Sequence, residues 1–315
     1  MRIIRHFKCL PDDVRGAAVA IGNFDGVHLG HRAVIGEAGR IAKAGGLPWA
    51  VLTFEPHPTA LFRPNSEPFR LTPFRAKARQ IAALGVDALI VLRFDRTFAS
   101  LEAEEFIARV LVDGLAARHV VSGYDFAFGR GRKGDCAMLL KKGAQLGFGF
   151  TSLQAVADEG GGALSSTRAR QCLKNADPRG AAEILGRPFE IEGRVRPGDR
   201  RGRTIGFPTA NLGLGSSLRP AAGVYAVRAA LSRTDGQDWR SGVANLGRRP
   251  TFGGAEDLAL EAHLFDFSGD LYGRMLRVAL IDYLRPEKKF DGIESLKAQI
   301  AQDGDRARRL LAAAS

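Results

Sequence analysis

The sequence predicts two domains of different class: an N-terminal α/β domain with a doubly wound parallel sheet, and a small antiparallel β-barrel that ends in a helix. In the first half, apolar strand-like runs alternate with helical patterns, as in βαβ units. From residue 189 onward, short β-type runs follow one another with turn residues between them. A helical stretch at 179–185 followed by Gly186-Arg-Pro188 marks the change, so we expect domains at 1–182 and 183–315.

In the first domain, the apolar run 17–21 predicts a buried strand, and the mixed stretch 29–44 predicts a helix packed on a sheet. The alternation continues with strands expected at 49–54, 88–92 and 119–122 and helices at 74–84, 104–112 and 137–146. In sheets of this kind, ligands bind at the carboxyl ends of the strands. The loops at those ends are therefore the first places to look for a site.

In the second domain, the β-type runs predict strands at 189–195, 223–231, 239–246, 258–265 and 275–283. The last segment, 293–311, is apolar at helical spacing and predicts a helix that closes the domain.

The strongest compositional signal is a formal net charge of +12 over 315 residues, with a pI near 10.1. Such a surplus fits either nucleic-acid binding or the capture of polyanionic small substrates. The arginines are scattered, and no zinc-finger or RNP-type pattern occurs, so we expect no nucleic-acid partner. Three widely spaced cysteines fit no disulfide framework, and no run is long and apolar enough for a membrane span. We therefore expect a cytoplasmic protein without a membrane partner.

The most informative run, 22–31, reads Gly-Asn-Phe-Asp-Gly-Val-His-Leu-Gly-His and lies between the first expected strand and helix. Backbone N–H groups at a helix start attract phosphate, and Gly22 and Gly26 let the backbone approach a ligand. His28 and His31, at i and i+3, share one helical face and can meet an anion together. A bare pair at this spacing is more often a surface pair or half of a zinc site, and its context is what favours phosphate.

Two further loops of the first half carry polar groups. Residues 122–134 place Asp125, aromatic residues and several basic groups among glycines, which by itself also describes an ordinary surface loop. Residues 164–170, Leu-Ser-Ser-Thr-Arg-Ala-Arg, put hydroxyl groups at an expected helix start with Arg168 just inside it, which suits a triphosphate but also an ordinary helix cap.

In the second domain, 193–212 combines glycines with Pro208-Thr-Ala-Asn211. Thr209 and Asn211 are two apart, so in an extended chain both point to one face and could serve Mg²⁺ and phosphate, although such a pair is commonly a cross-strand hydrogen-bonding feature. Glu261 stands in an otherwise apolar strand and is the candidate general base, with a surface ion pair as the alternative. His263, on the same face, is expected to be structural.

The run 22–31 resembles the signature of nucleotidyltransferases that use a His-x-Gly-His turn. Residues 125–129 resemble the Asp-Phe-x-Phe-Gly element of flavin adenylyltransferases, and 164–170 their Ser-Ser-Thr-x-x-Arg element, with Leu164 and Ala169 where isoleucine is common. The resemblance implies that catalytic His28 and His31 hold the α- and β-phosphates, and that ATP and phosphate are bound by Gly22, Asn23, Phe24, Asp25, Asp125, Ser166, Thr167 and Arg168. Candidate rings for the isoalloxazine are Phe54, Phe62, Phe126 and Phe128.

The run 193–212 resembles riboflavin kinases, whose hallmark is a Gly-rich loop leading into Pro-Thr-Ala-Asn, and 266–273 and 283–290 match them too. This implies that Glu261 takes the proton of the ribityl 5′-hydroxyl and that Thr209 and Asn211 bind Mg²⁺. The ATP contacts implied in the kinase are Gly198, Gly202, Arg203, Gly206 and Pro208.

Because the two resemblances cover nearly the whole chain in one order, the chain is identified as a member of the bacterial bifunctional riboflavin kinase/FAD synthetase family, whose first domain is Rossmann-like. The resemblance implies phosphorylation of riboflavin to FMN with ATP in the barrel, then attack of the FMN phosphate on the α-phosphate of a second ATP, giving FAD and pyrophosphate. Riboflavin, FMN, FAD and ATP are then the partners and Mg²⁺ the cofactor. Any self-association is expected to be transient.

Three alternatives remain at this stage. A riboflavin kinase with an inactive first domain should have lost His28, His31, Asp125 and Arg168, all of which are present. A nucleotidyltransferase for another acceptor leaves the second half without a purpose. A non-enzymatic RNA-binding protein explains the charge and little else, and salt-sensitive RNA binding would support it.

Overall fold

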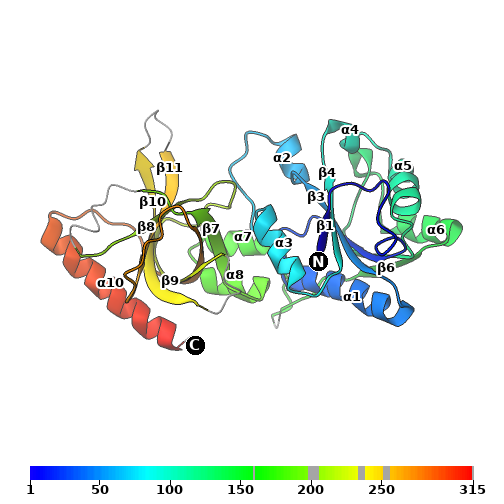
Figure 1. Cartoon of the computed structure of the whole chain (residues 1–315). Coiled ribbons are helices and arrows are strands. Elements are labelled where there is room, and N and C mark those ends of the chain that lie inside the picture. Colours follow the sequence, from blue (N-terminus) through cyan, green and yellow to red (C-terminus); the bar gives the residue numbers. More distant parts are fainter. Residues whose placement is uncertain (159, 198–205, 233–237, 251–255, 314–315) are drawn as a thin grey trace. The chain divides into compact units, whose positions relative to one another are not determined.

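The computed structural model describes residues 1–158, 160–197, 206–232, 238–250 and 256–313. The chain forms two compact units, one of residues 1–67 and 72–165 and the other of residues 68–71 and 166–315 (Figure 1). The helix that begins at Ser166 therefore lies in the second unit, whereas the sequence-based division at 182/183 groups it with the first domain. Where the two activities divide along the chain stays a prediction.

The first unit is built on a six-stranded parallel sheet in the order β1-β4-β3-β2-β5-β6. Its strands are β1 (Arg2–Ile4), β2 (Ala18–Ile21), β3 (Trp49–Glu55), β4 (Ala88–Arg93), β5 (His119–Gly123) and β6 (Gly149–Leu153). The predicted doubly wound α/β class is confirmed. The edge strand β1, which the sequence analysis did not anticipate, pairs with β4.

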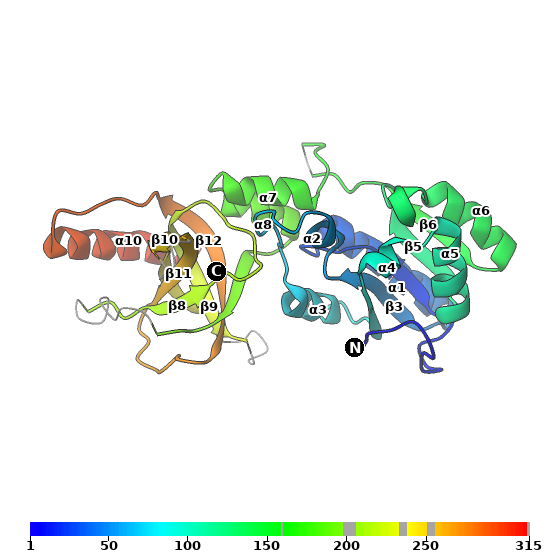
Figure 2. The ribbon, with the colours of Figure 1, turned by 90° about the horizontal axis from the view of Figure 1, so that it is seen from above.

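Helices cover both faces of this sheet (Figure 2). They are α1 (Leu29–Gly45), α2 (Pro58–Phe62), α3 (Phe74–Ala82), α4 (Arg96–Ala99), α5 (Ala103–Phe106), a π-helix continuing α5 (Ile107–Gly114), a short 3₁₀ turn (Arg130–Arg132) and α6 (Cys136–Leu146). One hydrophobic core lies against α5, the π-helix and α6, and the other against α1 and α3. Alternate residues of the strands enter the two cores, which is why all four residues of β2 are buried.

The second unit contains a six-stranded antiparallel sheet in the order β7-β12-β9-β10-β11-β8. Its strands are β7 (Phe189–Arg194), β8 (Ala210–Gly213), β9 (Gly223–Leu231), β10 (Arg240–Pro250), β11 (Glu256–Leu264) and β12 (Met275–Arg285). A bridge between Arg196 and Asn211, with a 2.9 Å bond from the Arg196 N–H to the Asn211 carbonyl, connects the two ends of the sheet. The sheet is thus nearly a closed barrel, as predicted.

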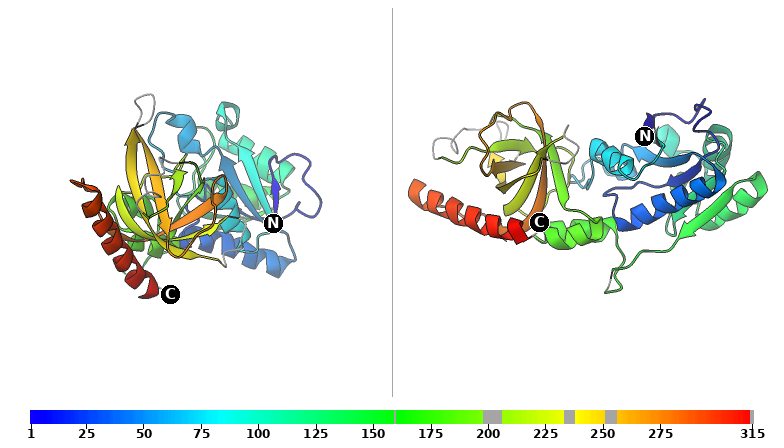
Figure 3. Two further views of the ribbon diagram at one scale, coloured as in Figure 1. Left: turned by 60° about the vertical axis from the view of Figure 1, so that its left-hand side comes forward. Right: turned by 60° about the horizontal axis from the view of Figure 1, so that its bottom comes forward.

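The described residues of the second unit also form the helices α7 (Ser166–Lys174), α8 (Pro178–Leu185) and α10 (Ile293–Ala313). The C-terminal α10 lies along one side of the sheet (Figure 3), where Ala307 and Leu311 are buried against β9, β10 and β12. A bidentate ion pair between Arg285 of β12 and Asp303 of α10, with the closest N–O distance 2.7 Å, fixes the helix on the strand.

Candidate active sites

The order of strands in the first unit places its most unusual loops together. The chain runs from β2 outward through β3 to β4 and then returns to add β5 on the other side of β2. Such a reversal opens a crevice at the carboxyl ends of the two central strands, and ligands bind there. The loop 22–28 leaves β2 at this point, and the loop 123–134 leaves β5 beside it, because Ala20 pairs with Val121. We call residues 22–28 the phosphate loop.

The two histidines of the first unit meet at the start of α1. His28 is the N-cap of the helix, and its Nδ1 accepts the His31 N–H at 3.2 Å. The two rings stack with their centroids 3.6 Å apart, and Gly30 leaves room for them because a Cβ there would lie 3.1 Å from the His28 ring. With Nδ1 accepting, the proton of a neutral His28 is on Nε2, a donor suited to a phosphate oxygen.

The phosphate loop has a backbone shape that needs outside support. Phe24 and Val27 have φ of 49° and 43°, and Gly26 has φ of 91°. A non-glycine residue in the left-handed region costs about 1–2 kcal/mol. Asp25, predicted to contact phosphate, is buried, and its Oδ1 accepts the N–H of Thr72 at 2.9 Å. The Thr72 hydroxyl in turn accepts the Gly26 N–H at 2.8 Å.

A buried lysine supports the same loop, and the sequence analysis missed it. Lys77 of α3 is completely buried, and its Nζ lies 2.9 Å from Glu55 Oε1, 2.9 Å from the Asn23 carbonyl and 3.3 Å from Thr53 Oγ1. Burying a lone ammonium costs several kcal/mol, so these oxygens are what make its position tolerable. In the sequence, Lys77 differs from a surface lysine only in its position on the apolar face of a helix. It is therefore easily mistaken for an exposed lysine.

In the loop after β5, the carboxylate of Asp125 is exposed. Phe126 and Phe128 stack with centroids 5.6 Å apart. Among the candidate flavin-binding rings, Phe54 and Phe128 are buried in the core and have little surface left for a ligand, whereas Phe62 is 67 % exposed and Phe126 is partly buried. Phe62 and Phe126 thus remain the accessible candidates.

Ser166, Thr167 and Arg168 form the start of α7, which confirms the expected helix start. Leu164 and Ala169 are buried, in agreement with their expected packing role. Because α7 belongs to the second unit, the contribution of these three residues to the site of the first unit stays a prediction.

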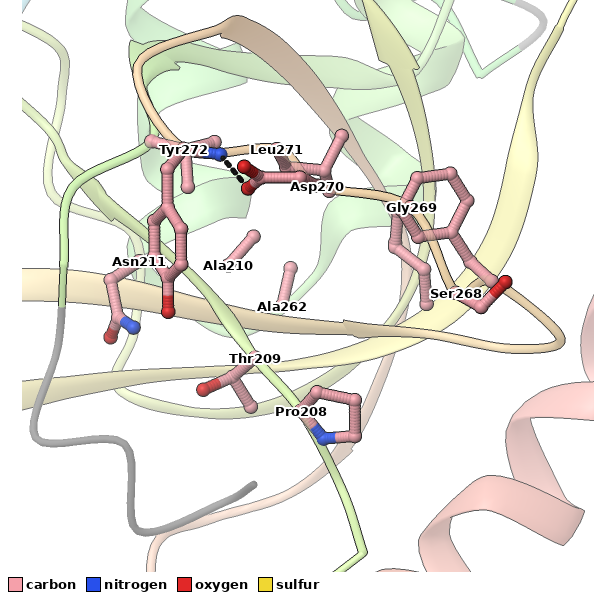
Figure 4. Close-up of a pocket in the computed structure, with 13 residues that line it drawn as sticks. Pro208, Thr209, Ala210, Asn211, Ala262, Ser268, Gly269, Asp270, Leu271 and Tyr272 are labelled. Carbon is pink, nitrogen blue, oxygen red and sulfur yellow. Dashed lines mark hydrogen bonds between the residues drawn. The ribbon is translucent and has the colours of Figure 1, made fainter.

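The second unit contains a cavity of about 660 Å³ beside the Pro-Thr-Ala-Asn run. Figure 4 shows Thr209 and Asn211 among the side chains that line it, together with Asp270 and Tyr272 from the loop before β12. Asp270 Oδ1 accepts the Tyr272 N–H at 2.9 Å and so shapes this loop. Gly206, with φ of 89°, comes just before the run. The predicted ATP ligands Gly198, Gly202 and Arg203 lie outside the described residues.

Strand register places the candidate base beside Asn211, which lines the cavity, although Glu261 is not itself one of the lining residues. Glu261 of β11 is directly opposite Asn211 of β8, and residues opposite each other in an antiparallel pair have side chains on the same face. Ala262 and Leu264 of β11 line the cavity itself. His263 Nδ1 donates to the Pro208 carbonyl at 2.9 Å, which secures the chain just before Thr209. This contact supports the structural role expected for His263.

The oxygen atoms at this cavity fit a hard cation. Asn211 is 8 % exposed, and its buried Oδ1 has no hydrogen-bond partner within the described part of the chain. Together with the Thr209 hydroxyl it offers the neutral oxygen ligands that Mg²⁺ accepts beside water and phosphate. No cluster of three or more His, Cys, Asp or Glu side chains suited to a metal occurs among the described residues.

These features define a class of protein: a two-domain enzyme with a nucleotidyltransferase-type loop at a parallel sheet and a separate phosphate-handling barrel. Family models agree with this division, since the FAD synthetase model matches residues 10–168 and the riboflavin kinase model matches residues 185–311.

Curated relatives match over nearly their whole length. The bifunctional riboflavin kinase/FMN adenylyltransferase of Escherichia coli K12 is 46 % identical, covering 98 % of this chain and 97 % of that protein. The enzyme of the same description from Bacillus subtilis is 40 % identical, covering 93 % and 92 %. The chain therefore belongs to the bifunctional riboflavin kinase/FMN adenylyltransferase family and is a transferase of flavin cofactor biosynthesis.

A solved structure from Streptococcus pneumoniae, described as a macrolide-efflux protein, has the same fold throughout: the TM-score is 0.84 at 32 % identity, covering 97 % of this chain and 98 % of that one. Within the described residues of the present chain, no helix has the length and apolar character needed to cross a membrane.

Proposed function

We propose that the barrel of the second unit phosphorylates riboflavin to FMN and that the first unit then joins FMN to the AMP part of a second ATP. The observation that carries the proposal is that each unit has its own set of candidate groups for phosphate chemistry: the stacked histidines at a helix start, and Asn211 in the lining of a cavity with Glu261 opposite it on the neighbouring strand. Family membership supports the order of the two reactions.

In the kinase step, Glu261 accepts the proton of the ribityl 5′-hydroxyl as its oxygen attacks the γ-phosphorus of ATP, and ADP leaves. Thr209 and Asn211 would hold Mg²⁺, which neutralises charge on the phosphate oxygens. Gly206 and Pro208 are proposed to contact the nucleotide. The implied contacts of Gly198, Gly202 and Arg203 with ATP belong to the same proposal.

In the adenylyl step, an oxygen of the FMN phosphate attacks the α-phosphorus of ATP, and the bond to the β-phosphate oxygen breaks to release pyrophosphate. His28 Nε2–H and His31 stabilise the charge that develops on the phosphate oxygens, aided by the backbone N–H groups at the start of α1. Gly22, Asn23 and Phe24 shape the turn around the phosphates, with Asp125, Ser166, Thr167 and Arg168 as further ATP contacts. Asp25 acts by holding the phosphate loop through Thr72.

We place these reactions in the cytoplasm, which is supported by the three free cysteines. The positive net charge aids the capture of ATP, FMN and pyrophosphate, which are all anions. Any association between copies of the chain is proposed to be transient.

The test is a time course of the purified protein with riboflavin, ATP and Mg²⁺, with the flavins separated by chromatography. We expect FMN to accumulate first and FAD to follow, and FAD to form directly when FMN is supplied. FMN without FAD would contradict the role proposed for the first unit. Unchanged riboflavin together with FAD from supplied FMN would contradict the role of the barrel.

A further inference from the structure

We propose that Lys77 is a positioning residue for adenylyl transfer, because its ammonium holds the phosphate loop in the shape that presents His28 and His31 to the phosphates. The inference rests on the function proposed for the first unit and adds to it a residue outside the run 22–31.

Lys77 contacts the backbone of the phosphate loop and does not contact the substrate. Its side chain has no exposed surface, so it cannot be a direct ligand of a bound nucleotide. An ammonium group donates protons to nearby oxygens, and those around this one include the Asn23 carbonyl and Glu55 Oε1, each at 2.9 Å, and Thr53 Oγ1 at 3.3 Å. The Asn23 carbonyl belongs to the backbone of the phosphate loop itself.

The Asn23 carbonyl is held by two donors that come from different elements. Thr53 of β3 donates its hydroxyl to the carbonyl at 3.2 Å, and Lys77 of α3 donates its ammonium. Asn23 precedes the left-handed residue Phe24, so the orientation of its peptide sets the direction in which the strained turn begins. We call these two hydrogen bonds to the Asn23 carbonyl the clamp. The clamp acts at the start of the turn that ends at His28.

A second contact holds the far part of the loop from the same side. Thr72, just before α3, binds both Asp25 and the Gly26 N–H. The segment 72–77 therefore supports the loop at two places, one by a neutral hydroxyl and backbone and one by a buried charge. Removing the charged contact should let the loop relax from its left-handed conformation, with the histidines moving with it.

The decisive variant is Lys77→Met, which keeps much of the side-chain length and removes the ammonium. Because small misplacements of catalytic groups are costly, we expect kcat for FAD formation from FMN to fall about tenfold to hundredfold. The KM for FMN should change little, since Lys77 does not touch the substrate. FMN formation by the same sample should be unchanged and reports that the protein is folded.

The matched control is Lys142→Met. Lys142 lies in the same unit, on α6, where it pairs with Glu104 at 2.8 Å near the surface. This substitution removes the same groups from an ion pair that supports no loop of the site, so both activities should stay at the wild-type level. An equal loss in the two variants would overturn the proposal.

A spectroscopic measurement separates this inference from the proposed function. The imidazole Cε1–H resonances of His28 and His31 should shift in Lys77→Met and stay in place in Lys142→Met, while that of His119 stays in place in both. Unchanged His28 and His31 resonances in Lys77→Met, or full kcat, would overturn the proposal. If the wild type makes no FAD, the proposed function fails, and the resonances still decide whether the clamp exists.

Should Lys77→Met fail to fold, Thr53→Val tests the same carbonyl. Valine keeps the branched shape of this buried strand residue and removes the other hydrogen bond to the Asn23 carbonyl. We expect a smaller fall in kcat for FAD formation, in the same direction and again without a change in the KM for FMN. Wild-type kcat in Thr53→Val would overturn the clamp.

Discussion

The candidate site of the first unit is drawn largely from one short run of sequence, whereas the site of the second unit is assembled from strands that are far apart along the chain. His28 and His31 stack because they occupy the cap and first turn of a single helix. Asn211 and Glu261 meet because β8 and β11 pair in one register. The comparison shows that local geometry can be foreseen from spacing, whereas a site between strands depends on the register of the whole sheet.

The kinase site also depends more heavily on the alternation of side chains. A shift of β11 by one residue relative to β8 would put Glu261 on the opposite face of the sheet and replace it by an apolar neighbour, Leu260 or Ala262. The phosphate loop has no such sensitivity to register, but it carries backbone strain and needs contacts from α3. The two sites should therefore fail independently and for different reasons.

The largest effect is expected at the candidate base. Glu261→Gln should lower FMN formation by about 10²–10⁴-fold, the usual contribution of a positioned general base. FAD formation from supplied FMN should be unchanged, because the histidines lie in the other unit. The control is Glu192→Gln on β7, where the carboxylate accepts the Ser232 hydroxyl at 2.7 Å. Loss of both activities in a folded Glu261→Gln protein would contradict separate sites.

The converse change is His28→Ala. Removing one preorganised donor from a developing charge should lower FAD formation by about 10²–10³-fold and leave FMN formation intact. His119→Gln serves as the control, because His119 lies at the amino end of β5, where it hydrogen-bonds Thr151. If His119→Gln lowers FAD formation as much as His28→Ala does, the proposed role of His28 and His31 in adenylyl transfer is contradicted.

A smaller effect is expected from the groups of the barrel that we propose as metal ligands. Asn211→Leu removes the buried Oδ1, and the Mg²⁺ concentration for half-maximal FMN formation should rise about tenfold, equivalent to about 1.4 kcal/mol of binding free energy. The Mg²⁺ dependence of FAD formation from supplied FMN should not move. A parallel shift in both titrations would mean that Asn211 does not serve the barrel alone.

The smallest effect concerns the stability of the protein and the burial of His119. Burial lowers the pKa of His119 below its usual value of 6.5, and Arg40 adds to this while Glu37 opposes it. As the pH falls below 6.5, the unfolded chain takes up a proton more readily than the folded protein, so stability is lost. In urea titrations from pH 7 to pH 5, His119→Gln should lose less unfolding free energy than the wild type. If the unfolding free energy falls equally between pH 7 and pH 5 in both proteins, the burial of His119 does not cause this loss of stability.

Much of the fold could be read from the sequence because its signals are periodic. The buried strands and amphipathic helices of the first unit fall where apolar spacing predicts them, and α1 and β2 agree closely with the prediction. The short edge strand β1 was missed because three residues carry no usable period. The π-helix at Ile107–Gly114 was expected as an ordinary helix, because apolar spacing alone does not separate the two.

The candidate sites divide in the same way. The histidines, Thr209 and Asn211 could be found because their spacing is meaningful within one element. Lys77 could not, since Arg75 and Arg79 flank it at close range and make its helix resemble a solvated basic surface. Its burial among oxygen atoms becomes visible only in the tertiary structure, where α3 packs against the phosphate loop.

The sequence by itself determined the two domain classes, the family and most of the candidate polar groups for phosphate chemistry, because these depend on residue type and on spacing along one element. The tertiary structure alone decided which groups act together: Glu261 with Asn211, and Lys77 with Asn23. It also showed that Asp25 supports the loop through Thr72. The reason is physical, since pairing register and burial are set by packing between distant segments, which the local sequence does not encode.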